Sequence, residues 1–128
     1  MDLLTTFSTL SSNHNYTRPD LLHQQGARVG TIAISQGRHP IAERLHQGTR
    51  FIPNDVLLTA GRNVQLVLGP NSSGKSTYLR TVAVTVVLAQ SGCFVPAKRC
   101  QLQLRDRILS RLSSGHQVLF PLSIFLSN

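Results

Sequence analysis

The chain has 128 residues, with 13 lysines and arginines against 5 acidic residues, and its formal net charge is +8. Hydrophobic residues make up 41%, which argues against wholesale disorder, and the length allows one domain at most. The longest apolar run, residues 82–89, is far shorter than the ~20 residues that a membrane span needs, so we expect no membrane partner. The arginines are scattered from Arg18 to Arg111, which favours solvated surface over a nucleic-acid-binding patch.

Acidic and thiol side chains are scarce. The acidic residues are Asp2, Asp20, Glu43, Asp55 and Asp106. They leave few candidates for chemistry that needs paired carboxylates. Cys93 and Cys100 are too few and wrongly spaced for a zinc site. A disulfide between them stays open, but reduced thiols in a cytosolic or nuclear protein are the favoured interpretation.

The first half of the chain predicts a helix, a long loop and a short strand. Leu3, Leu4, Phe7 and Leu10 recur at helical spacing, and the turn-forming residues behind them should end that helix. The expected elements are a helix at 2–10 with a turn at 11–13, a loop at 15–30, a strand at 31–35 that breaks at 37–40, and a short helix or irregular turn at 41–46.

The second half predicts a strand that enters a glycine-rich turn, followed by a helix. The expected elements are a loop at 51–55, a strand at 56–59, a turn at 60–63, a buried strand at 64–68 and a helix at 75–90 that Gly92 stops. Propensity alone favours a strand in the valine-rich part of that helix, but the motif before it requires a helix. Its expected apolar face consists of Leu79, Val82, Ala83, Val86 and Val87.

Residues 69–76, Gly-Pro-Asn-Ser-Ser-Gly-Lys-Ser, fit the phosphate-binding pattern G-x-x-x-x-G-K-[ST] at each fixed position. Gly69 and Gly74 permit backbone angles and close approaches that a Cβ would forbid, so successive N–H groups can form an anion nest. Lys75 then places a cation near the β- and γ-phosphates, and the Ser76 hydroxyl ligates the Mg²⁺ that bridges them. An incidental glycine-rich turn is the alternative, which the flanking strand and helix disfavour.

A phosphate-binding loop does not by itself hydrolyse nucleotide, because hydrolysis also needs an acidic residue at the end of a second strand. After Lys75 the sole carboxylate is Asp106, which lies between two arginines and lacks an apolar run before it. We therefore interpret Asp106 as a surface ion-pair residue and assign no catalytic residue. We expect no measurable intrinsic hydrolysis, and whether the chain is an enzyme stays open.

Several stretches together resemble the MutS family of DNA mismatch-recognition ATPases, in order and spacing, from about residue 15 to about residue 112. They are 15–19 (NYTRP), 37–41 (GRHPI), 51–55 (FIPND), 69–80 (GPNSSGKSTYLR), 89–97 (AQSGCFVPA), and 106–108 with 110–111 (DRI and SR). The G-P-N-x-x-G-K-S-T-Y form of the loop, with G-x-[FY]-V-P-A after it, separates this family from other P-loop proteins.

The resemblance implies an incomplete α/β fold of the P-loop NTPase type, similar to the ABC ATPases. Residues 1–28 would end a preceding helical clamp region, 29–114 would form the N-terminal half of the ATPase domain, and 115–128 would be a divergent apolar tail. The implied cofactors are ATP or ADP with Mg²⁺. The expected nucleotide-binding residues are Phe51, Ile52, Gly69, Pro70, Asn71, Ser72, Ser73, Gly74, Lys75, Ser76 and Thr77, with Mg²⁺ reached through Ser76.

In this resemblance the adenine ring stacks on Phe51 beside Ile52, and Asn71 contacts the phosphates. From the residues alone, an ordinary core aromatic is the preferred interpretation of Phe51. The resemblance also implies a partner subunit of the same family, whose signature segment completes the site, and DNA bound by the full-length protein. Mismatch repair and meiotic recombination both stay open as the process, with a nuclear location in a eukaryote and a cytoplasmic one otherwise.

The family's segments beyond Arg111 are not matched by residues 113–126, which suggests a truncated product with a foreign ending. His116 is therefore not the family's switch histidine, and His39 is expected to be structural. Two other functions stay open. An interaction module without nucleotide chemistry would use an exposed apolar tail at 118–126. A P-loop ATPase of the transporter or chromosome-structure type would differ downstream of residue 112.

Overall fold

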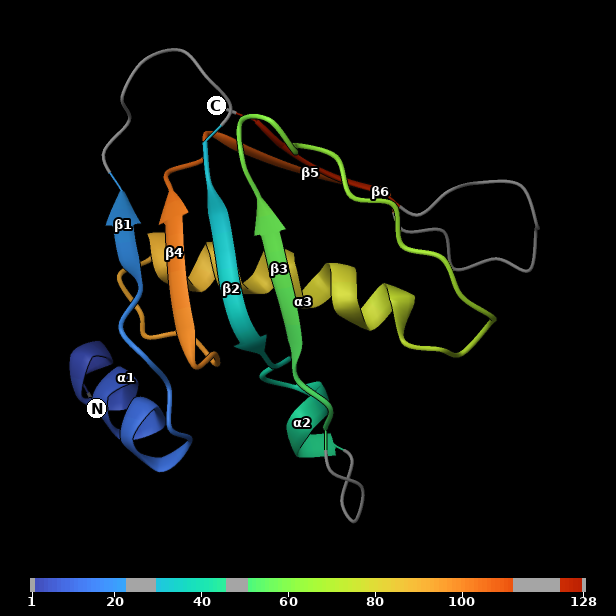
Figure 1. Cartoon of the computed structure of the whole chain (residues 1–128). Helices are drawn as coiled ribbons and strands as arrows, with labels where there is room; N and C mark the ends of the chain where they lie inside the picture. Colours follow the sequence, from blue (N-terminus) through green and yellow to red (C-terminus); the bar gives the residue numbers. More distant parts are fainter. Residues whose placement is uncertain (1, 23–29, 46–50, 112–122, 128) are drawn as a thin grey trace.

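The structure, a computed structural model, describes residues 2–22, 30–45, 51–111 and 123–127 (Figure 1). Its elements are α1 (Leu3–Asn13), β1 (Asp20–Leu22), β2 (Ile32–Gly37), α2 (Ala42–Leu45), β3 (Asn54–Leu58), α3 (Lys75–Gln90), β4 (Arg99–Gln103), β5 (Arg107–Arg111) and β6 (Ser123–Ser127). The chain is a mixed α/β structure, which confirms the predicted class. In the part of the chain described, no helix combines the length and apolarity that a membrane crossing requires.

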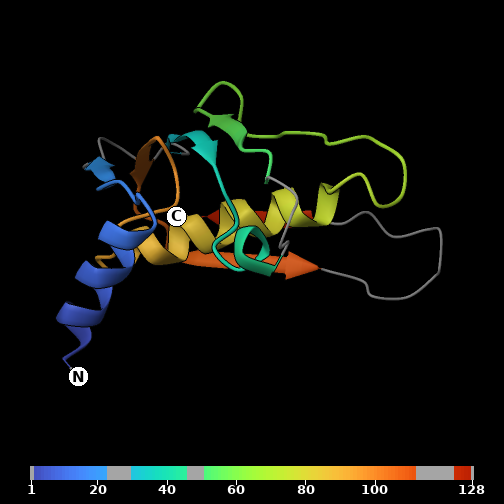
Figure 2. The ribbon, with the colours of Figure 1, turned by 90° about the horizontal axis from the view of Figure 1, so that it is seen from below.

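A four-stranded mixed sheet in the order β1-β4-β2-β3 forms the centre. β1 runs parallel to β4, whereas β2 is antiparallel to both β4 and β3. α3 lies between this sheet and a two-stranded antiparallel ribbon of β5 and β6 (Figure 2). The short helices α1 and α2 lie at one end of the sheet (Figure 1). α3 therefore supports the sheet, and the glycine-rich turn lies directly before its first residue, Lys75.

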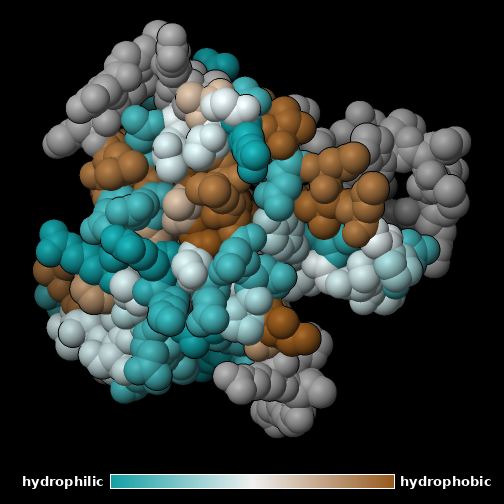
Figure 3. Space-filling model, viewed as in Figure 1, coloured by the Kyte–Doolittle hydropathy of each residue, from teal (hydrophilic) through white to brown (hydrophobic). Residues whose placement is uncertain are grey.

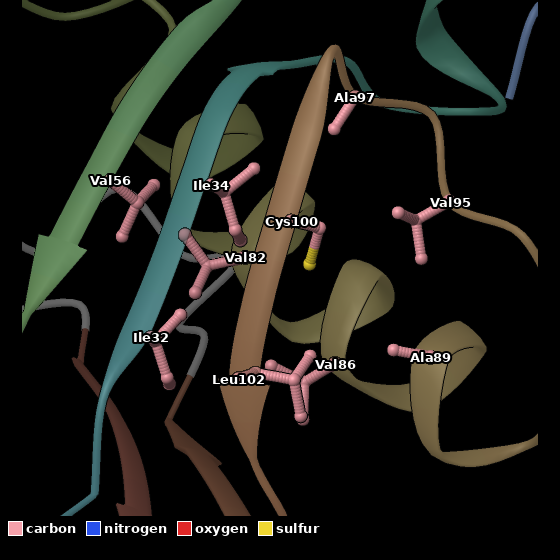
Figure 4. Packing of buried hydrophobic residues seen from close by; sticks show 10 residues of the cluster. All are labelled: Ile32, Ile34, Val56, Val82, Val86, Ala89, Val95, Ala97, Cys100 and Leu102. Carbon is pink, nitrogen blue, oxygen red and sulfur yellow. The ribbon is translucent and has the colours of Figure 1, made fainter. Parts of the chain in front are cut away.

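The core lies between the sheet and α3, and it follows from the alternation of side chains along each strand. Ile32 pairs with Leu102 across the β2–β4 ladder, and Ile34 pairs with Cys100. These side chains point to the face that α3 covers (Figure 4). The buried cluster comprises Ile32, Ile34, Val56, Val82, Val86, Ala89, Val95, Ala97, Cys100 and Leu102. Burial of this cluster fixes α3 against the sheet.

The predicted helix at 75–90 is confirmed as α3, and Gly92 ends it as expected. Gly92 has φ +79°, its N–H donates to the Ala89 carbonyl, and the Cys93 N–H donates to the Leu88 carbonyl. These two bonds form a Schellman motif, which needs a residue in the left-handed region. The predicted apolar face is wrong in part. The buried residues are Thr81, Val82, Thr85, Val86 and Ala89, and the predicted Val87 is 52% exposed.

Residues 64–68, predicted to be a buried strand, are neither a strand nor buried. Val64, Leu66 and Leu68 are 84%, 79% and 81% exposed. A strand needs a neighbour that pairs with its N–H and C=O groups, and no described strand pairs with this segment. The apolar run is present in the sequence, but within the part of the chain described no strand pairs with it to bury its side chains.

Three further predictions are corrected. α1 continues to Asn13, because Ser11 satisfies its hydroxyl within the helix by donating to the Phe7 carbonyl at 2.7 Å. The predicted loop at 15–30 contains β1, which forms because β4 offers a parallel partner, and residues 23–29 lie outside the described residues. The sequence predicted no strand at β4 itself, a short strand in which polar residues alternate with Cys100 and Leu102.

The two cysteines are free, buried thiols, so the disulfide alternative is excluded. Burial raises the pKa of both thiols, that of Cys100 to about 11, and both therefore stay protonated at neutral pH. The predictions for His116 and for residues 113–122 lie outside the described residues. Of the expected apolar tail, the structure describes the backbone of β6, which pairs with β5.

Candidate functional site

Residues 69–74 fold into a tight turn that leads directly into α3. The Ser73 N–H donates to the Pro70 carbonyl at 3.3 Å, and Ser72 and Gly74 adopt left-handed backbone angles, with φ +62° and +92°. Gly74 meets this requirement without the strain that a Cβ adds. A Cβ on Gly69 would lie 2.9 Å from the Ser73 hydroxyl oxygen. Gly74 therefore meets a backbone requirement of the turn, as predicted, whereas the contact at Gly69 is with the end of the Ser73 side chain, which can rotate away.

The Lys75 side chain folds back over the start of the turn. Its Nζ donates to the carbonyl oxygens of Gly69 at 2.6 Å and Pro70 at 2.5 Å. No carboxylate among the described residues forms an ion pair with it. An ammonium held by neutral carbonyls can exchange them for an anion without first breaking an ion pair. The cation is therefore in place for phosphate binding.

The N-terminus of α3 has no side-chain cap, and its Ncap residue is Gly74. The first N–H groups of a helix have no acceptor within the helix, and the helix dipole makes this end electropositive. Ser76 is exposed in this first turn and Thr77 is half-buried. Donors, a cation and a hydroxyl thus gather at one helix end, which is the arrangement that anion-binding sites use.

One cleft brings the loop together with Phe51 and Ile52. It has a volume of about 900 Å³, within the range of small-molecule sites. Phe51 is half-buried, and Ile52 is 79% exposed. The predicted residues that line the cleft are Phe51, Ile52, Gly69, Pro70, Ser73, Gly74, Lys75 and Thr77. The other predicted residues, Asn71, Ser72 and Ser76, are exposed and do not line it.

Tyr78 also lines this cleft, together with Asp55 and Gln65, and the sequence analysis did not single it out. Its hydroxyl lies 3.0 Å from the Gln65 side-chain oxygen and 3.3 Å from the Asp55 carbonyl, and it can donate to either. Burial raises the pKa of Tyr78 above its ordinary value of 10.0, so the hydroxyl is a protonated donor at neutral pH. Its spacing of three residues from Lys75 places both on one side of α3, a signal that the sequence did contain.

Arg38 ties α1 to α2 beside this cleft. Its Nη2 donates to the carbonyls of His14 at 3.0 Å and Asn15 at 3.2 Å, and its Nε lies 3.4 Å from the Glu43 carboxylate. A guanidinium beside the last carbonyls of a helix also complements the helix dipole. Arg38 and Glu43 line a second cleft of about 580 Å³, and Phe51 lines this cleft as well. Arg38 therefore has a structural role, because it connects the C-terminal end of α1 to α2.

His39 acts as a cap for the chain that enters α2, which confirms its predicted structural role. Its Nδ1 accepts hydrogen bonds from the N–H groups of Ile41 and Ala42, each at 3.2 Å. Burial lowers the pKa of His39, and the positive charge of Arg80 lowers it further. The imidazole is therefore neutral at pH 7, with Nδ1 as an acceptor.

Asp106 is exposed, and it forms no ion pair with any described residue, so its predicted ion pair is wrong. Exposed charge pairs contribute little free energy, and neighbouring arginines alone do not hold them together. Within residues 2–22, 30–45, 51–111 and 123–127, no group of three or more His, Cys, Asp and Glu side chains could hold a metal ion.

Comparison with known proteins adds independent findings. The family model for MutS domain V matches residues 65–128, a range that contains the loop, α3 and the β5–β6 ribbon. "DNA mismatch repair protein MutS" of Oceanobacillus iheyensis is 39% identical over 126 residues, and its counterpart in Bacillus subtilis is 35% identical. "DNA mismatch repair protein MutS 2" of Halobacterium salinarum is 43% identical. Each alignment covers 98% of this chain and 14% of the relative, so the chain spans about a seventh of their length.

Proposed function

The chain belongs to the MutS family, and from this premise we propose that it is the ATP-binding part of a P-loop NTPase domain. The observation that carries the proposal is the cleft that has Phe51 and Ile52 on one wall and, on the other, residues of the 69–74 turn with Lys75 and Thr77 of α3. A nucleotide needs both walls, because its base stacks on a flat aromatic surface and its phosphates need N–H donors and a cation.

The residues of the cleft fit a magnesium nucleotide. Phe51 would take the base beside Ile52, and Lys75 would exchange its two carbonyl partners for phosphate oxygens. The uncapped N–H groups at the start of α3 would face the same phosphates. Asn71 and Ser76, which are exposed and do not line the cleft, would contact the phosphates and ligate Mg²⁺ respectively. When bound, the magnesium nucleotide supplies a phosphoanhydride bond that can be cleaved.

For the full-length protein, the proposal is a role in DNA mismatch repair, carried out as a dimer bound to DNA. The relatives named for this process support it, because the chain aligns with them over 98% of its length. In such a dimer a partner subunit would complete the cleft, which is open in this chain. Meiotic recombination is the variant of the same proposal, with a nuclear location in a eukaryote.

Two lysine variants test the nucleotide site, since Lys75 and Lys98 are the only lysines of the chain. Lys75→Ala removes the cation of the cleft, and Lys98→Ala removes the same charge from an exposed position outside it. Calorimetric titration with ATP and Mg²⁺ should show a loss of roughly 10- to 100-fold in affinity for Lys75→Ala, the size of a lost charge-assisted hydrogen bond. Lys98→Ala should bind like the unchanged chain. Equal affinity in all three proteins would refute the assignment of the loop.

A second candidate function is an interaction module that pairs with another MutS-family subunit and uses no nucleotide. The exposed apolar side chains of Val64, Leu66 and Leu68 favour it, because such patches mark interfaces (Figure 3). The same titration separates the two candidates. An unchanged chain that binds no ATP but co-purifies with a full-length MutS-family partner would support the module and contradict the nucleotide proposal.

A further inference from the structure

We propose that Tyr78 is a positioning residue that sets the spacing between the base wall and the phosphate wall of the cleft. The inference rests on the proposed ATP binding and goes beyond it, because it assigns the discrimination between a nucleotide and bare polyphosphate to one hydroxyl group. The feature behind it is the position of that hydroxyl, which lies within hydrogen-bond distance of an acceptor on Asp55 and of an acceptor on Gln65 and can donate to either of them.

The contacts of Tyr78 connect three parts of the chain. The ring rises from the first turn of α3, three residues after Lys75. Its hydroxyl lies 3.3 Å from the carbonyl of Asp55, in the strand that directly follows the Phe51–Ile52 wall. The same hydroxyl lies 3.0 Å from Oε1 of Gln65, in the segment that runs into the 69–74 turn. All of these residues line the one cleft.

The segment that carries Gln65 has no strand partner among the described residues to hold it in place. Asp55 is better held, because its carboxylate accepts a hydrogen bond from the Gln36 N–H at 2.6 Å and its strand pairs with β2. The hydroxyl donates to one of these acceptors at a time, so Tyr78 ties the first turn of α3 either to the fixed strand at Asp55 or to the unpaired segment at Gln65. Removal of its hydroxyl should let the spacing between the walls vary.

Variable spacing matters for a ligand that binds both walls at once. When two groups of one ligand bind two linked sites, the second contact is intramolecular, and its benefit depends on how well the spacing matches the ligand. ATP contacts both walls in the proposed site, whereas inorganic tripolyphosphate can contact the loop alone. Loss of the Tyr78 tie should therefore weaken ATP and leave tripolyphosphate unaffected.

The same hydrogen bonds should matter little for folding. Asp55 and Gln65 are exposed, so water can replace either acceptor when the hydroxyl is lost. A structural role of Tyr78 would lower thermal stability and weaken both ligands together. A positioning role would change the ratio of the two affinities while stability stays the same.

The experiment measures the affinities of Mg²⁺–ATP and Mg²⁺–tripolyphosphate by calorimetry, with thermal denaturation of each protein beside them. For Tyr78→Phe we expect ATP affinity to fall about fivefold, the size of one net hydrogen bond, while tripolyphosphate affinity stays within about twofold. Gln65→Leu should change the ratio in the same direction by the same amount or less. The double variant should equal Tyr78→Phe alone, because both substitutions remove one shared bond.

Tyr16→Phe is the matched control, since Tyr16 is the other tyrosine of the chain and is buried away from this cleft. It should leave both affinities unchanged. An unaltered affinity ratio in Tyr78→Phe, or an equal loss for both ligands, would overturn the positioning role while ATP binding stands. If the unchanged chain binds neither ligand, the proposed function fails and this inference fails with it.

Discussion

The β4–β2 centre of the sheet and the segment between β3 and α3 contain similar apolar residues, yet they differ completely in burial. Leu102 of β4 is 0% exposed, whereas Leu66 of the connecting segment is 79% exposed. Leu102 lies between two glutamines, and Leu66 lies between Gln65 and Val67. Leu102 has a paired strand on each side and α3 across its face, and Leu66 has neither. Burial here follows from the pairing of strands rather than from hydrophobicity.

The paired region and the connecting segment also contribute differently to the candidate site. The paired region holds α3 rigidly through its buried face, so the first turn of the helix has a defined position. The connecting segment leaves its backbone and its turn open toward the cleft, where a ligand can reach the loop. A rigid helix end with an open loop before it suits the capture of an anion.

A pair of leucine variants tests the contrast most strongly. Leu102→Ala should lower the free energy of unfolding by about 2–5 kcal/mol, because it removes buried atoms and leaves a cavity. Leu66→Ala, which removes the same atoms from an exposed position, should change it by less than about 0.5 kcal/mol. Urea unfolding followed by circular dichroism measures both. Similar losses in the two variants would mean that the connecting segment is buried in solution.

A pair of glycine variants should change the free energy of unfolding by less. It again compares one position that the fold constrains with one that it does not. A Cβ at Gly92 or at Gly61 would meet no atom within 4 Å, but only Gly92 has a left-handed φ, at +79°. Gly92→Ala should therefore cost about 1 kcal/mol from backbone strain at the end of α3. Gly61→Ala, in the turn after β3, should be close to neutral. Equal unfolding midpoints for the two variants would contradict the role of Gly92 in the Schellman motif.

Local features of the fold could be predicted from the sequence, and long-range ones could not. The boundaries of α3 and its stop at Gly92 were predictable because the loop motif, the helix and its cap are continuous in the chain. β1 and β4 escaped prediction because each is short and pairs with strands far away in the sequence, β1 with β4, and β4 also with β2. Their residues Asp20 and Gln101, which share a hydrogen bond, are 81 positions apart. No local pattern reports such a pairing.

The candidate site shows the same division. The phosphate loop follows from its own spacing, and the resemblance to the MutS family placed Phe51 and Ile52 beside it in the predicted site. Their common cleft appears only in three dimensions. The link through Tyr78 was hidden for a further reason. Gln65 was predicted to lie in a buried strand, and that prediction gave no indication of a hydrogen bond between its side chain and the hydroxyl of a helix residue.

The smallest expected effect on the free energy of unfolding comes from His39, at the end of the paired region. This effect appears only at acidic pH. Its Nδ1 can accept the N–H groups of Ile41 and Ala42 only while the imidazole is neutral. Burial, with the charge of Arg80, lowers the pKa of His39 in the fold below the ordinary 6.5, while Glu43 opposes this shift. The unfolded chain therefore takes up the proton first as pH falls. The stability that neutral His39 contributes is fully present above about pH 6.5 and is lost as pH falls through the lowered value.

His39→Asn isolates this contribution, because an amide oxygen can accept the same N–H groups and does not titrate. Urea midpoints of the two proteins should be compared near neutral pH and at about pH 5. The unchanged chain should lose more stability between the two conditions than the variant does. The other histidines are identical in both proteins, so their titration cancels in the difference. An equal loss of stability in the two proteins would mean that His39 can take up a proton in the folded chain at no cost. The structure at α2 would then not depend on a neutral acceptor at position 39.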